Sequence, residues 1–189
     1  IRNSIIKDNN INFIEQLRYF EDKTFGWDLF GKIKNAHYIR KQLYSYYVYP
    51  NVSSAVARSI SLGFKVSYFK LVANSIKKGF ENFSLSQDEI KRLVDQGLIF
   101  YIITLLVSYS HSLELGKVER KYAIKIRRKL INEILADSEI IHAAKNYLPS
   151  NKESKWIPKA ISFRSRLLLE FACNIRAKQV IKKRSIGQE

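Results

Sequence analysis

The stretch that decides the fold runs from Ser86 to Gly116 and reads SQDEIKRLVDQGLIFYIITLLVSYSHSLELG. Ser86 and Glu89 have the spacing of a capping box, in which each side chain binds the other residue's backbone N–H at a helix start. Gly116 is suited to end the same helix. Between them, apolar residues at helical spacing form one stripe: Ile90, Leu93, Val94, Leu98, Tyr101, Ile102, Leu105, Leu106 and Tyr109.

More apolar residues fall on the other side of this predicted helix: Ile99, Phe100, Ile103 and Val107. A helix that is apolar on most sides is buried on most sides, so we expect it to be the centre of a helical core. Its longest apolar run, residues 98–107, is interrupted only by Thr104. At about 1.5 Å per residue this run is too short to cross a hydrocarbon layer of about 30 Å. We therefore interpret it as a buried segment and not as a membrane span.

Helical periodicity also marks the neighbouring segments. It predicts helices over residues 69–80, 118–134 and 139–147, the second of them with a basic polar face. After a short linker at 149–152, one amphipathic helix is expected from residue 157 to 175, with Pro158 in its first turn. We accordingly divide this part of the chain into a helical region, 61–148, and a basic C-terminal helix, 149–189.

The first 60 residues have a mixed pattern. Residues 2–9 indicate a helical turn, residues 11–14 a short strand, and a helix with apolar residues as far as 36 begins close to Asp22. Residues 37–49 are rich in Tyr, Ile and Val, which is typical of a strand or hairpin edge closed by the turn at Pro50. The predicted fold class is thus mostly α with a small β element.

The net charge of +16 is concentrated in the last third, where residues 117–189 hold 18 basic and 7 acidic residues. Such a field attracts nucleic acid, an anionic lipid surface or a phosphate-bearing substrate. Three interpretations remain: solvated helix faces, a membrane-surface patch, or an RNA-binding surface. The last finds no support in a GXXG loop or in aromatic sheet signatures.

Cysteine and histidine offer no metal or disulfide pattern. Cys173 is the single cysteine, and His37, His111 and His142 lie far apart. Neither arrangement has the spacing of a zinc site. The absence of a disulfide framework is typical of a reducing compartment.

Several elements of the first third, taken in order, are similar to a stretch of bacterial family 2 glycosyltransferases of the GT-A type. The elements are Arg2-Asn3-Ser4-Ile5-Ile6, Asn10-Ile11-Asn12-Phe13, Glu21-Asp22-Lys23-Thr24-Phe25-Gly26-Trp27, Leu43-Tyr44-Ser45-Tyr46 and Asn51-Val52-Ser53-Ser54. The resemblance implies that residues 1–60 are the C-terminal portion of a GT-A catalytic domain. It also implies inverting transfer of a sugar from a nucleotide sugar to a glycan or lipid-linked acceptor.

In the resembled family the aspartate of the Glu-Asp pair is the general base, a role that falls here on Asp22, with Glu21 orienting the acceptor. The family's nucleotide site and the ligands of its Mg²⁺ or Mn²⁺ belong to an N-terminal half that is not in this chain. We therefore expect a fragment or a processed product that is inactive alone. The expected location is cytoplasmic, peripheral on the inner face of the cell membrane.

Four further residues are candidates for acceptor or donor binding. The aromatic rings of Trp27, Tyr44 and Tyr46 can stack on sugars, and Arg58 can approach a phosphate. Each has an ordinary alternative, namely sheet packing for the tyrosines and a solvated helix position for Arg58. Asp22 itself can be read as a helix cap. The competing hypothesis for the whole chain is a non-catalytic basic helical module that binds a membrane surface or RNA.

Overall fold

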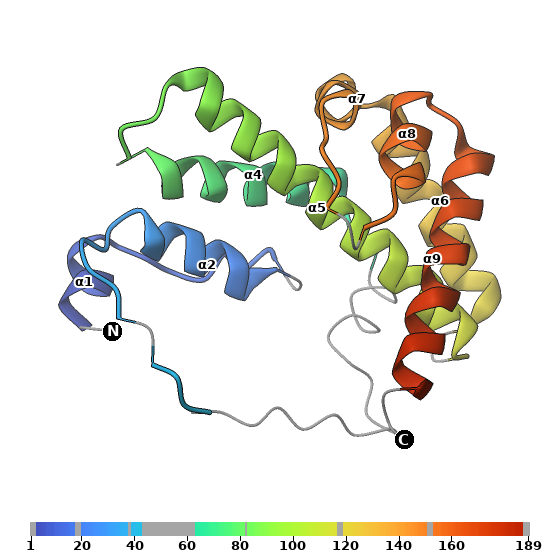
Figure 1. Ribbon diagram of the computed structural model, residues 1–189, viewed down its shortest axis with the longest axis horizontal. Helices are drawn as coiled ribbons and strands as arrows, with labels where there is room; N and C mark the ends of the chain where they lie inside the picture. The colour runs from blue at the N-terminus through green and yellow to red at the C-terminus, as the bar shows by residue number, and fades with distance from the viewer. Residues whose placement is uncertain are drawn as a thin grey trace.

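The computed structural model describes residues 3–17, 20–37, 39–42, 63–81, 83–116, 119–150 and 153–186. The described part of the chain is mostly helical, and no β-strand occurs in it (Figure 1). The helices are α1 (Asn3–Asp8), α2 (Glu21–Phe30), α4 (Val66–Phe80), α5 (Gln87–Glu114), α6 (Arg120–Ala136), α7 (Ser138–Lys145), α8 (Trp156–Ser162) and α9 (Arg166–Ile186).

The two ends of α5 are fixed as the sequence predicts. The Ser86 backbone N–H donates to Glu89 Oε2 at 2.8 Å, and the Glu89 backbone N–H donates to Ser86 Oγ at 3.3 Å. This reciprocal capping box satisfies two N–H groups that have no partner within the helix. Beyond the other end, Gly116 has φ 64°, a left-handed conformation that glycine adopts without a steric penalty.

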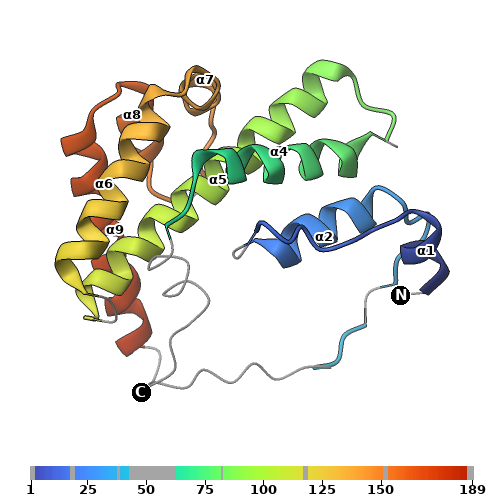
Figure 2. The ribbon, with the colours of Figure 1, turned by 180° about the vertical axis from the view of Figure 1, so that it is seen from behind.

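α5 is the central helix of the fold. It contacts α4, α6, α7, α8 and α9, which lie around it in both views of the ribbon (Figures 1 and 2). Leu98, Ile102, Leu105 and Leu106 are buried, as predicted. α5 is also long and apolar enough to cross a membrane by length and composition, so the ten-residue length argument was too narrow. The core helix of a globular protein has the same properties, and the helices packed around α5 give it that position here.

A charged side chain lies inside this core. Arg127 of α6 is buried, and its guanidinium donates to Ser110 Oγ of α5 at 2.8 Å and to Asn174 Oδ1 of α9 at 2.9 Å. Glu170 of α9 lies 4.0 Å from the same guanidinium. Burial lowers the pKa of Arg127, and the charge of Glu170 opposes that shift. The network joins three helices through one side chain.

Two sequence predictions are wrong in detail, and a third is tested only in part. Residues 11–14 form no strand; they are an irregular segment that packs Ile11 inward. The helix that begins near Asp22 ends at Phe30 and does not reach residue 36, because Gly31 lies against the Lys78 backbone of α4 and the chain turns there. The segment 37–49 is described only at 37 and 39–42, which form no strand; the rest lies outside the described residues.

The predicted C-terminal helix is two helices. The chain turns between α8 and α9 at Arg164, which has φ 54° and donates its backbone N–H to the Ile161 carbonyl. Pro158 lies in the first turn of α8, as expected. The turn lets α8 bury Ile157 and Ile161 while α9 takes a separate path along α5.

The position of α5 generates a stability prediction. Leu105 is 0% exposed, whereas Leu167 of α9 is 75% exposed, so the two leucines form a matched pair. Leu105→Ala should lower the free energy of unfolding by about 2–5 kcal/mol, because it removes buried methyl groups and leaves a cavity. Leu167→Ala should change it by less than about 0.5 kcal/mol. Chemical denaturation of both variants tests this, and equal effects would contradict the core described above.

Candidate functional site

The acidic pair lies at the N-terminus of α2, where the sequence places it. Phe20 precedes the helix with φ 70°, in the left-handed region, and no side chain caps the helix. Glu21 and Asp22 occupy the first turn, where a carboxylate is favoured by the positive end of the helix dipole. Asp22 is therefore not the cap of α2, and the alternative reading of it as a capping residue is wrong.

The Asp22 carboxylate is accessible. Its side chain is 66% exposed and lies 3.3 Å from the ammonium of the adjacent Lys23, which is also exposed. An ion pair in this setting contributes little to stability, so it leaves the carboxylate able to meet another group. Glu21 is half-buried, and its backbone carbonyl accepts a hydrogen bond from Thr24 Oγ1 at 2.9 Å. None of the grooves described below is lined by Asp22.

Aromatic packing holds the start of α2 in place. Phe13 stacks on Phe25 with 4.5 Å between ring centroids, which ties the preceding segment to the helix. Phe20 packs edge-on against Phe64 and against Tyr101 of α5, so the residue before the acidic pair is itself part of the core. The backbone at the start of α2 is thereby attached to the core through Phe20.

Trp27 anchors α2 to the helical region. Its indole N–H donates to Tyr101 Oη of α5 at 3.3 Å, and its ring packs against Phe30 and Phe80. At this crossing α2 and α4 approach so closely that a Cβ on Gly79 would lie 2.9 Å from Trp27 Cε3. Trp27 was predicted as a sugar-binding platform; the structure assigns its ring to packing between helices, about one and a half turns after Asp22.

The other predicted binding residues, Tyr44, Tyr46 and Arg58, lie outside the described residues. The structure thus brings Glu21, Asp22 and Trp27 onto one short helix and does not place the remaining three.

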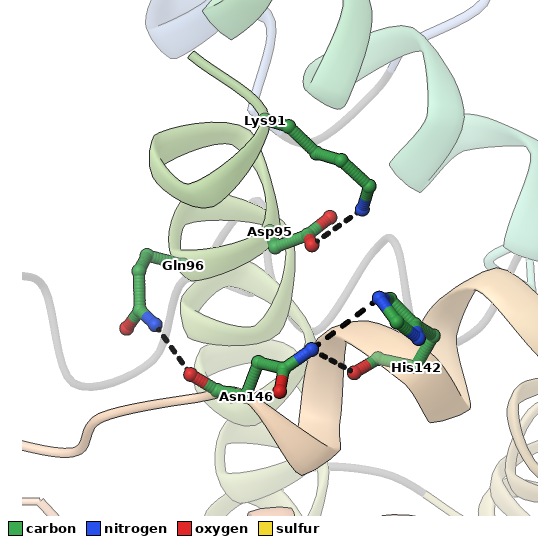
Figure 3. Close-up of polar contacts among 5 residues, drawn as sticks. All are labelled: Lys91, Asp95, Gln96, His142 and Asn146. Carbon is green, nitrogen blue, oxygen red and sulfur yellow. Dashed lines mark hydrogen bonds and ion pairs between the residues drawn. The ribbon is translucent and has the colours of Figure 1, made fainter. Parts of the chain in front are cut away.

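A cleft between α4, α5 and α7 that holds two groups of charged side chains was not predicted. It has a volume of about 620 Å³. Lys70 reaches Asp137 at 3.2 Å and Glu139 at 3.0 Å, and hydrogen bonds to these carboxylates raise the pKa of Lys70. Lys91 pairs with Asp95 at 2.8 Å across one turn of α5 (Figure 3).

On the α7 side of the same region, His142 and Asn146 lie one turn apart, with 3.3 Å between His142 Nε2 and Asn146 Nδ2 (Figure 3). Gln96 of α5 donates to the Asn146 carbonyl at 3.1 Å and accepts from the Leu148 backbone N–H at 3.2 Å. These hydrogen bonds attach the end of α7 to α5. Because Lys70 pairs with Asp137 and Glu139, and Lys91 pairs with Asp95, the cleft has the character of a structural ion-pair network. Only its i,i+4 spacings were visible in the sequence.

Within the described residues, no group of three His, Cys, Asp or Glu side chains could hold a metal ion. Cys173 is buried, and burial raises its pKa to about 12, which keeps the thiol protonated and unreactive at neutral pH. Comparison with family models, with curated proteins and with solved structures finds no match to this chain.

The close crossing of α2 and α4 generates a prediction with a built-in control. Gly79→Ala should lower the free energy of unfolding by about 1–3 kcal/mol, because the new methyl group meets the Trp27 side chain at 2.9 Å and its backbone oxygen at 3.0 Å. Gly26→Ala, also in a helix but with nothing within 4 Å of the new methyl group, should raise stability by about 0.5–1 kcal/mol. Thermal unfolding with hydrogen exchange of α2 amides tests both; destabilisation by the two variants alike would disprove the crossing.

Proposed function

We propose that this chain is the acceptor-side part of an inverting glycosyltransferase of the GT-A type, followed by a helical region, with Asp22 as the general base. One observation supports this proposal most. The Asp22 carboxylate lies on the first turn of α2, where it is exposed and does not cap the helix, and the helix itself is anchored to the core. Under this proposal residues 1–60 are the end of the GT-A catalytic domain.

The proposed step is direct displacement. An acceptor hydroxyl oxygen attacks the anomeric carbon of the nucleotide sugar, its proton passes to an oxygen of Asp22, and the bond from the sugar to the diphosphate breaks with inversion. A positioned carboxylate can accept a proton in this way only if it is ionised beforehand. Glu21, the neighbour of Asp22, is proposed to orient the acceptor.

The leaving diphosphate needs a positive charge, which Mg²⁺ or Mn²⁺ supplies in the resembled family. This proposal assigns the metal and the nucleotide sugar to residues outside 1–189. The acceptor would be a glycan or a lipid-linked precursor of a surface glycan.

Rigid attachment of α2 supports the assignment. A general base must be held within a fraction of an ångström of its working position to be effective. The hydrogen bond from Trp27 to Tyr101 and the contact of Trp27 with Gly79 couple the helix that carries Asp22 to α4 and α5. On this proposal, Trp27 is a positioning residue for the base.

The second candidate function is a basic helical module without an active site that binds a membrane surface or RNA. The observation that favours it is an exposed face of α8 and α9 with apolar and basic side chains. The two candidates differ in what they require of Asp22, since a binding module has no need of its carboxylate.

The test of the enzyme is therefore Asp22→Asn in the complete protein, with its nucleotide-binding half. We expect kcat to fall at least about a hundredfold, with a smaller change in KM, because the amide cannot accept the proton. Asp88→Asn is the matched control, since Asp88 is also an exposed acid in the first turn of a helix. Its kcat should be unchanged. An Asp22→Asn enzyme with full kcat would refute the assignment.

A further inference from the structure

α8 and α9 are buried on one side and apolar on the other. Their inner sides supply Ile157, Ile161, Leu169 and Cys173 to the core, as an amphipathic helix is expected to do. The outer sides carry five large apolar side chains that are between 42% and 75% exposed: Trp156, Phe163, Leu167, Phe171 and Ile175. An exposed apolar cluster of this kind is typical of a surface that binds a protein, a membrane or a ligand.

Four of these side chains form a ladder. Phe163, Leu167, Phe171 and Ile175 follow one another at intervals of four residues, which places the three in α9 above one another on one side of the helix. Lys178 continues the same side one turn further on, where the apolar ladder ends. α9 lies at the outer edge of the molecule in both ribbon views (Figures 1 and 2).

A groove runs between the ladder and the start of α8. It has a volume of about 500 Å³, and its walls include Trp156, Leu168, Phe171 and Ile175, with Arg176 and Lys155 at its edge. The Lys159 ammonium lies 5.6 Å from the centre of the Trp156 ring. The apolar surface is thus continuous from α9 to Trp156 and is bordered by cations.

The charge on this surface is predominantly positive, although Glu153 is also in the wall of the groove. Residues 153–186 contain nine basic and two acidic residues. Both acids have partners away from the ladder: Glu153 accepts from the Tyr147 hydroxyl and the Ser150 backbone, and Glu170 pairs with Arg127 and Arg128. The basic side chains of Lys155, Lys159, Arg164 and Arg166, by contrast, are exposed.

We propose that this face of α8 and α9 docks on an anionic lipid bilayer, with α9 lying parallel to the membrane plane. The apolar ladder enters the boundary between headgroups and acyl chains, while the surrounding Lys and Arg side chains meet anionic headgroups. This is charge complementarity combined with apolar burial, and it does not depend on the proposed catalytic role of Asp22.

Two other occupants fit less well. A second copy docked face to face would bring two strongly basic surfaces together, and the repulsion between them opposes association. RNA is attracted by the charge, but it is bound through stacking of bases on aromatic rings, and Leu167 and Ile175 in the middle and at the end of the ladder cannot stack. Aliphatic and aromatic side chains serve equally well in a lipid interface.

The experiment measures co-sedimentation of the chain with vesicles of phosphatidylcholine containing about one third phosphatidylglycerol. We expect binding that weakens as salt is raised and that is lost on pure phosphatidylcholine. The double variant Leu167→Ser/Phe171→Ser should bind at least about tenfold more weakly. Phe100→Ser, which alters an exposed aromatic residue of α5, should bind like the unchanged chain.

A variant with fewer basic residues tests the electrostatic part of the proposal independently. Arg164→Gln/Arg166→Gln should weaken binding to the anionic vesicles about fivefold per charge removed. Thermal unfolding of both double variants should match the unchanged chain, because the altered side chains are exposed. The proposal would be overturned if the chain did not bind the vesicles, if it bound neutral vesicles equally well, or if Leu167→Ser/Phe171→Ser bound as tightly as the unchanged chain. It would also be overturned if the chain bound a single-stranded RNA in a salt-sensitive manner and did not bind vesicles. A dimer of the chain that Leu167→Ser/Phe171→Ser dissociates would overturn it in the same way.

Discussion

The rest of the structure depends on one constraint, which is that α5 is apolar on most of its circumference and must be covered on several sides at once. No single neighbouring helix can do this. α4, α7 and α9 each pack along α5, and α6 and α8 contact it as well. The order of the helices in space therefore follows from the composition of one segment, and burial of its leucines and isoleucines is the main favourable contribution to folding.

Arg127 adds a second, more specific constraint. A buried guanidinium is costly unless its donors find acceptors, and here Ser110 and Asn174, on two different helices, both accept from its Nη1. Apolar packing alone allows neighbouring helices to slide with small changes in energy. A side chain that needs acceptors from α5 and α9 together favours one alignment of α6 against both.

The sequence predicted most where the signals were local. Ser86 with Glu89, Gly116, and the periodicity of α4 and α5 are all features of consecutive residues, and the structure confirms each. The errors arise where contacts between distant segments decide. Gly31 ends α2 because α4 lies against it, and Arg164 adopts a left-handed turn that separates α8 from α9. At the candidate site, the position of Asp22 at a helix start could be predicted, but the packing role of Trp27 could not, because its partners Gly79 and Tyr101 lie far along the chain.

The crossing of α2 and α4 constrains how this sequence can change. Trp27 and Gly79 are 52 positions apart, yet each occupies space that the other leaves. A larger residue at 79 would meet both the side chain and the backbone oxygen of Trp27, so substitutions at the two positions are not additive in their effects. A smaller residue at 27 removes only the first contact, and a larger residue at 79 therefore requires α2 to shift against α4, which changes the tilt of the helix that carries the acidic pair.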